Sequence, residues 1–288
     1  MTIELEHGDF RLALLPELGG SVRSFTYAGA DILRPAPAGV ALTPLETAGF
    51  PLFPFSGRIN HGCFAWNGRT VQLAPNFPPE SHAIHGQAWL KPWDLEHLES
   101  GLAHLSYRHA QDEWPWAYRA EQSFELTGRG LRLTLSISNL SDETMPAGLG
   151  WHPYFPRQDA LLSADVSGIW TAASGMIPDQ LAPLTAPNNL RSARPVDLLD
   201  LDNAFTVSAG QTGIAWPARQ MRVRMEASGR LNHLVVYVPK GQDFFCVEPV
   251  SHAPDAVNSV YGRETTGLRE LAPGENLSAS IDIAVERI

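Results

Sequence analysis

Hydrophobic and polar residues alternate along several segments of this chain. The alternation is clearest in residues 117–126, 131–137, 221–225 and 277–285. In residues 131–137 the aliphatic side chains at odd positions are separated by Arg132, Thr134 and Ser136. Because successive side chains of a β-strand point to opposite faces, each segment predicts a strand with one buried face.

Glycine and proline interrupt the chain throughout, with 24 and 23 residues respectively, as a fold with frequent turns requires. The tetrapeptide 127–130, Thr-Gly-Arg-Gly, separates two alternating segments and therefore predicts a β-hairpin. We find no segment with helical periodicity over more than about three turns, so an alternating βαβ architecture is not expected. The pattern predicts an all-β fold built as a large antiparallel sandwich or barrel.

One domain over residues 1–288 is expected. Length alone would suggest about two domains, but all-β sandwiches and barrels often reach ~250 residues as one unit. No low-complexity linker divides the chain. Residues 177–195 are rich in Pro, Asn and Ala, and we interpret them as a long ordered loop rather than a domain boundary.

Composition excludes several classes of function. The chain has 288 residues, 44% of them hydrophobic, and a formal net charge of −10. An acidic protein does not offer the basic surface that nucleic acid or an anionic membrane requires, so no partner of either kind is expected. The first residues lack the basic and apolar regions of a secretory signal, and no stretch approaches ~18 apolar residues. We expect a cytoplasmic protein.

The only cysteines are Cys63 and Cys246, too few for a disulfide framework. Reduced, buried thiols are the preferred interpretation, and a single bridge between the two stays open.

Polar residues that are unusual for buried strands gather in five short segments. These are residues 54–62, 82–93, 150–156, 200–205 and 238–258. A single histidine beside glycine or proline is usually a turn residue. Glu248 is less ordinary, because it directly follows the apolar run 244–247 and so ends a predicted buried strand. A carboxylate there needs a partner, such as Arg58, or a function.

The five segments together resemble the motifs of the aldose 1-epimerase (galactose mutarotase) family. The matching motifs are Ser56-Gly57-Arg58-Ile59-Asn60, Ile84-His85-Gly86, Trp151-His152-Pro153-Tyr154-Phe155, Leu201-Asp202-Asn203-Ala204-Phe205 and Val247-Glu248-Pro249. Each motif is weak alone, but all five occur in the family's order and span nearly the whole chain. The resemblance implies a galactose mutarotase-like β-sandwich with a sugar cleft on one face.

The resemblance also implies residue roles. His152 resembles the general acid that protonates the ring oxygen, Glu248 the base that takes the proton of the anomeric hydroxyl, and His85 their assistant. Arg58, Asp202 and Asn60 are expected to bind sugar hydroxyls. Three aromatic residues near these motifs are candidates for covering the apolar face of a sugar, with core packing the alternative for each: Trp89, Trp151 and Tyr154.

The chemistry explains these residue types. Exchanging the anomers of an aldose requires the ring oxygen to gain a proton while the anomeric hydroxyl loses one. One acid and one base suffice, so neither a metal nor another cofactor is expected. Histidine suits the acid because its ordinary pKa of about 6.5 lies near neutrality. Glutamate is ionised at neutral pH, and burial strengthens it as a base.

Three other interpretations remain open. A non-catalytic sugar-binding or sugar-sensing module would use the same fold, although it has no need of an acid and base pair. A metalloenzyme could use His82 and His85 with Glu80, but no further ligand has a diagnostic spacing. A glycoside hydrolase could use Glu248 and Asp202, leaving the histidines without a part. The identity of the aldose, whether phosphorylated or otherwise modified, and the choice between monomer and homodimer are not predicted.

Overall fold

The computed structural model describes residues 1–172, 177–228 and 230–288. Within these residues β-strands predominate, and the only α-helix is α1 (Arg263–Thr266). The short 3₁₀ helices are η1 (Pro44–Glu46), η2 (Asn60–Gly62), η3 (Ala88–Leu90), η4 (Val196–Leu198) and η5 (Pro217–Arg219). No described helix is long and apolar enough to cross a membrane. The prediction of an all-β chain without long helices is confirmed.

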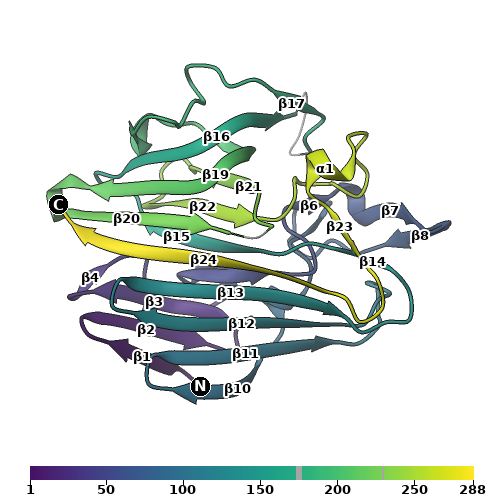
Figure 1. Cartoon of the computed structure of the whole chain (residues 1–288), viewed down its shortest axis with the longest axis horizontal. Coiled ribbons are helices and arrows are strands. Elements are labelled where there is room, and N and C mark those ends of the chain that lie inside the picture. The colour runs from purple at the N-terminus through teal and green to yellow at the C-terminus, as the bar shows by residue number, and fades with distance from the viewer. Residues whose placement is uncertain (173–176, 229) are drawn as a thin grey trace.

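Eighteen of the described strands form one large antiparallel sheet that curls on itself (Figure 1). One run of neighbours is β1 (Ile3–His7), β2 (Phe10–Leu15), β3 (Ser21–Tyr27), β5 (Gly49–Leu52), β15 (Gly150–Pro156), β22 (Phe244–Val250) and β21 (His233–Tyr237). The other run is β10 (Asp94–Glu99), β11 (Leu102–His109), β12 (Tyr118–Thr127), β13 (Gly130–Asn139), β24 (Asn276–Arg287) and β20 (Met221–Ala227).

The long strand β19 (Asp202–Trp216) joins the two runs. Its first part pairs with β21 and its last part with β20. On its other edge it pairs with β16 (Leu161–Thr171). The two runs thus face each other, and a single hydrophobic core contains Leu12 and Phe25 from one run and Leu133 and Ile281 from the other. The predicted antiparallel sandwich is confirmed.

The remaining strands are short. They are β4 (Ala30–Asp31), β17 (Gln180–Ala182) and β18 (Arg194–Pro195) in the large sheet, and the pairs β6 (Arg58–Ile59) with β9 (Ala83–Ile84), β7 (Cys63–Trp66) with β8 (Arg69–Gln72), and β14 (Met145–Ala147) with β23 (Arg269–Leu271). Residues 177–195, predicted as a loop, include β17 and β18, which pair with β16. Both cysteines are free, but only Cys246 is buried and Cys63 is half-buried.

The four alternating segments are the strands β12, β13, β20 and β24, and in each the hydrophobic parity is the buried one. The predicted hairpin is also present, since Thr127 pairs with Gly130 at the turn between β12 and β13. Gln122 is the exception to the apolar parity of β12. It is fully buried, and its side-chain N–H donates to the Gly20 carbonyl at 2.9 Å, which satisfies the donor of the amide inside the core.

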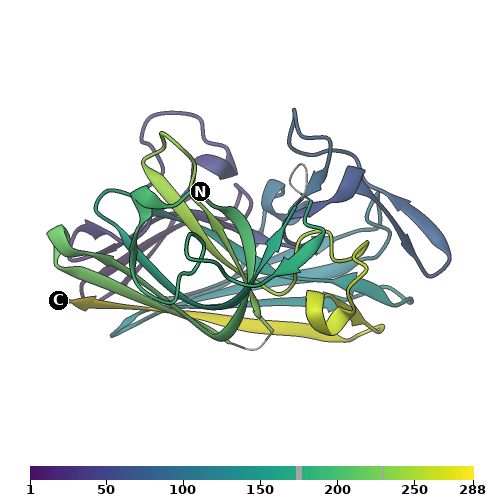
Figure 2. The same ribbon diagram turned by 90° about the horizontal axis from the view of Figure 1, so that it is seen from above.

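The outer face of β15 and β22 is also buried, and this positions the functional site. Trp151, Phe155 and Val247 point into the main core, whereas Tyr154 and Cys246 belong to a second hydrophobic cluster on the opposite face. Loops cover that second face. Figure 2 shows the loop after β4 (purple) and the loop between β8 and β9 (blue) rising on the same side of the sheets.

Candidate active site

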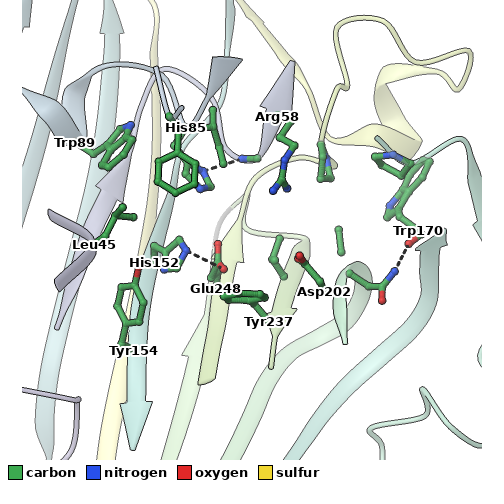
Figure 3. A pocket seen from close by; sticks show the side chains of 18 of the residues that line it. Leu45, Arg58, His85, Trp89, His152, Tyr154, Trp170, Asp202, Tyr237 and Glu248 are labelled. Atoms are coloured by element: carbon green, nitrogen blue, oxygen red, sulfur yellow. Dashed lines mark hydrogen bonds and ion pairs between the residues drawn. The ribbon is translucent and has the colours of Figure 1, made fainter. Parts of the chain in front are cut away.

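A cavity of about 420 Å³ lies on the outer face of β15, β22, β21 and β19, under these loops (Figure 3). The strand register builds its floor, because residues that pair across neighbouring strands share one face. One row across the strands contains His152, Glu248 and Val235, and the next contains Tyr154, Cys246, Tyr237 and Asp202. Residues far apart in the sequence are therefore neighbours on one rigid surface.

Glu248 and His152 form the centre of this floor. The Nε2 atom of His152 lies 3.3 Å from Oε1 of Glu248, and the two residues are 8% and 3% exposed. Burial raises the pKa of Glu248 well above its ordinary value, an effect that Asp202 reinforces and Arg58 opposes. Burial also lowers the pKa of His152 to about 3. A backbone hydrogen bond of His152 opposes this shift, and the charge of Arg34 adds to it. Each shift disfavours the charged form.

His85 enters the cavity from the turn that follows β9. Its φ is 60°, and that of Gly86 is 67°. A Cβ on Gly86 would lie 2.1 Å from the Phe53 carbonyl oxygen, so only glycine fits there. Nδ1 of His85 accepts a hydrogen bond from the Gly57 N–H at 3.1 Å. A neutral ring then carries its proton on Nε2.

The charge state of His85 follows from its surroundings. Burial lowers the pKa of His85 well below its ordinary value, and the nearby His152 and Arg58 act in the same direction. The side chain lines the cavity, so it offers a neutral N–H donor to a ligand.

Arg58 and Asp202 line the cavity beyond Glu248. Nη2 of Arg58 lies 3.1 Å from Oε1 of Glu80, so the ion pair considered between Arg58 and Glu248 is replaced by one with Glu80. Asp202 keeps contact with solvent. Partial burial raises the pKa of its carboxyl, while the charge of Arg58 opposes the rise.

Aromatic residues form much of the remaining wall. Trp89 and Tyr154, both considered from the sequence, line the cavity, and the Trp89 indole N–H donates to the Gly86 carbonyl at 3.0 Å. Sequence reasoning missed Tyr237, Phe244 and Trp170, which also line it. Tyr237 and Phe244 lie on strands with few polar residues, so only the register of those strands shows which face they occupy.

Arg34 was also missed. Its guanidinium lies 4.1 Å from the ring centre of Tyr154 and 4.5 Å from that of Phe244, and Nη2 donates to the carbonyls of Leu45 and Thr47. Burial lowers the pKa of Arg34, with nearby acidic groups opposing the shift. These contacts hold the loop after β4 against the cavity wall. No signal near Arg34 in the sequence indicates this position.

The structure places two of the residues considered from the sequence outside the cavity lining. Trp151 is fully buried in the main core, because it has the opposite parity to His152 on β15 and so faces away from the cavity. Asn60 is exposed and does not line the cavity; its backbone N–H donates to the Asp255 carboxylate at 3.0 Å. It begins the 3₁₀ helix η2, which follows β6.

The metal site considered from the sequence does not converge. Nδ1 of His82 accepts a hydrogen bond from the His61 N–H, His85 bonds to Gly57, and Glu80 pairs with Arg58. Within the described residues, a different group brings three ligand atoms within 4.8 Å of one another: His152, Cys246 and Glu248.

This chain is similar in sequence to proteins of a known family. The aldose 1-epimerase family model matches residues 1–284. The uncharacterized protein YphB of Escherichia coli strain K12 is 34% identical over 299 residues, covering 99% of each chain. YihR of the same strain, also uncharacterized, is 23% identical over 272 residues, covering 90% of this chain and 86% of YihR.

Solved structures agree with the sequence comparison. A crystal structure from Escherichia coli K12, provisionally named an aldose 1-epimerase, superposes with a TM-score of 0.90 at 32% identity over 100% of this chain and 99% of the other. A galactose mutarotase-like protein from Clostridium acetobutylicum has a TM-score of 0.89 at 20% identity, over 100% and 95% of the two chains, and shows the same fold. The chain therefore belongs to the aldose 1-epimerase family.

Proposed function

We propose that this protein is an aldose 1-epimerase that interconverts the α and β anomers of a free aldose within a single domain. The observation that carries the proposal is the contact of 3.3 Å between His152 Nε2 and Glu248 Oε1 on the floor of a cavity. An acid and a base side by side can serve two oxygens bonded to the same carbon. The ring oxygen and the anomeric hydroxyl of a sugar are such a pair.

Ring opening moves two protons. Glu248 takes the proton of the anomeric hydroxyl, and the electron pair of that O–H bond forms the aldehyde C=O bond. The bond from the anomeric carbon to the ring oxygen breaks, and the ring oxygen takes a proton from His152. Rotation about the next C–C bond presents the other face of the aldehyde. Closure then reverses both transfers and gives the other anomer.

The pKa shifts decide which protonation state the pair adopts at each stage of this cycle. Before opening, the pair holds its single proton on His152, and after opening it holds one on Glu248, so its net charge stays zero throughout. Burial disfavours the arrangement with an ionised Glu248 beside a charged His152 in the empty cavity. Hydrogen bonds from the sugar hydroxyl to the carboxylate, and from the imidazolium to the ring oxygen, offset that cost when substrate binds.

The surrounding residues support binding of a monosaccharide. We assign His85 as an N–H donor near the ring oxygen, and Arg58 and Asp202 as partners for hydroxyls farther round the ring. Trp89 and Tyr154 offer aromatic surface to the C–H face of the sugar. The direct contact of an acid with a base favours catalysis over a module that only binds sugar, because binding alone needs no group with a shifted pKa.

Polarimetry or one-dimensional proton NMR on freshly dissolved α-D-glucose and α-D-galactose tests the proposal. We expect wild-type protein to accelerate the approach to anomeric equilibrium, and Glu248→Gln to lose that acceleration by a factor of at least about 10²–10⁴. Glu4→Gln, at an exposed position on β1, is the matched control.

If neither hexose responds, the same measurement extends to pentoses, deoxy sugars and sugar phosphates. Sugar binding without acceleration across that panel would establish the binding module instead.

A further inference from the structure

Cys246 is a buried thiol that the proposed reaction does not use. It lies on β22 between Tyr154 of β15 and Tyr237 of β21, two residues before Glu248 and on the same face. The side chain is 0% exposed, and it packs in the hydrophobic cluster beneath the cavity. Its position places sulfur close to both members of the acid and base pair.

The three neighbouring side chains offer one nitrogen, one sulfur and one oxygen. A ligand atom of His152, the Sγ atom of Cys246 and a carboxylate oxygen of Glu248 all lie within 4.8 Å of one another. Three protein ligands of these types, with a fourth position open to a cavity, are the donor set of zinc sites that bind an exogenous ligand. Zinc bonds of about 2.0–2.3 Å require the three atoms to draw closer, which side-chain rotation can supply.

Charge also suits a divalent cation. An ionised Glu248, a Cys246 thiolate and a neutral His152 together neutralise two positive charges, so the occupied site is uncharged in a buried position. Thiolate favours a soft or borderline ion over magnesium or calcium. Of the other charged groups near the site, Asp202 favours a cation, whereas Arg34 and Arg58 oppose it.

We propose that His152, Cys246 and Glu248 form an inhibitory binding site for a thiophilic divalent cation such as Zn²⁺ or Cd²⁺. As the metal–sulfur bond forms, the Cys246 thiol releases its proton to solvent, and any proton on Glu248 leaves with it. The ion occupies the acid and the base, so it excludes the sugar. The inhibition rests on the proposed function, whereas the binding does not.

Titration of the full-length protein with CdCl₂ tests the binding. We expect one equivalent to bind with the ultraviolet charge-transfer absorption of a cadmium–thiolate bond, and ZnCl₂ to compete for the same site in calorimetry. Cys246→Ser should abolish the absorption band and weaken binding by at least about 10–100-fold. Cys63→Ser, which changes the half-buried thiol on β7, should keep both the absorption band and the affinity of the wild type. Cys246→Ala serves if the serine variant does not fold.

Zn²⁺ should also inhibit anomer exchange in the wild type and in Cys63→Ser, and much less in Cys246→Ser relative to that variant's own metal-free rate. Absence of the cadmium band in the wild type, or its persistence in Cys246→Ser, would overturn the proposal. A band without any sugar turnover would refute the proposed epimerase and leave the metal site standing. Sugar turnover without the cadmium band would refute the metal site and leave the proposed epimerase standing.

Discussion

The Nε2 atom of His152 lies 3.3 Å from Oε1 of Glu248, on adjacent strands, and burial shifts the pKa values of the two residues in opposite directions. The pair therefore holds one proton over a wide range of pH. A second proton is added only as pH falls toward the lowered pKa of His152, about 3. The last proton leaves only as pH rises through the raised pKa of Glu248.

We accordingly expect kcat/KM for anomer exchange to show a broad plateau, with an acid limb well below the ordinary histidine value of about 6.5. Initial rates between about pH 4 and 9, corrected for the spontaneous reaction in each buffer, measure this profile. An acid limb centred near 6.5 would contradict the expectation, because it would report a histidine with an ordinary pKa.

Replacing His152 by asparagine should lower kcat by about 10²–10⁴ while the fold is retained. Asparagine can hydrogen-bond to Glu248, but it cannot deliver a proton to the ring oxygen. Polarimetric progress curves give the rate, and circular dichroism checks the fold. His82→Asn is the control, since His82 lies near a surface turn outside the cavity lining. Equal losses in the two variants would remove His152 from the reaction.

Arg58→Ala and Asp202→Ala should mainly raise KM. A hydrogen bond to a charged group contributes about 1.5–3 kcal/mol, which corresponds to roughly 10–100-fold in binding. KM of the variants and of the wild type should be measured on the pH plateau, because the charge of Arg58 also lowers the pKa of Glu248. Asn60→Ala changes an exposed residue of the same motif and should leave KM unaltered. An unchanged KM in both cavity variants would exclude them from sugar binding.

Gly86→Ala should destabilise the protein and displace His85. The new Cβ would lie 2.1 Å from the Phe53 carbonyl oxygen at a φ of 67°, adding an overpacking cost of roughly 1–3 kcal/mol to a left-handed backbone cost of roughly 1–2 kcal/mol. Gly29→Ala is matched in backbone conformation, with φ 79°, and its Cβ meets no atom within 4 Å.

Urea unfolding of both glycine variants separates the two costs. The free energy of unfolding should fall more in Gly86→Ala than in Gly29→Ala, because Gly29→Ala adds only the backbone cost. Turnover should be lost only in Gly86→Ala. Equal losses would show that the turn after β9 can move to admit a side chain.

The strands of the sandwich follow from alternation because each has one apolar face, and β12, β13, β20 and β24 needed no further information. The acid and base candidates came from a family resemblance, and the register explains why they meet. The same alternation could have excluded Trp151, since His152 and Tyr154 share the other parity. Arg34 and Tyr237 could not be found, because their place in the cavity depends on pairing between strands and loops that are distant in the sequence.

His252 should make the folded protein sensitive to acid. Its Nε2 accepts a hydrogen bond from the Ser56 N–H at 3.1 Å, so its proton is on Nδ1, which donates to the Ala253 carbonyl at 2.7 Å. Burial lowers the pKa of His252 to about 4, although the bond to Ala253 opposes the shift. The unfolded chain binds this proton near the ordinary value of about 6.5.

The stability that neutral His252 contributes is thus complete above about pH 6.5 and is lost as pH falls from there toward 4, with a slope of up to about one proton. His252→Gln keeps an acceptor for Ser56 and removes the titration. The slope of the unfolding free energy against pH, from urea melts across this window, should therefore be smaller in the variant even if its absolute stability is lower. His7→Gln, at an exposed site, is the control. If wild type and His252→Gln share one slope, the bond to Ser56 does not depend on a neutral imidazole, and the loop that precedes β6 is held by other contacts.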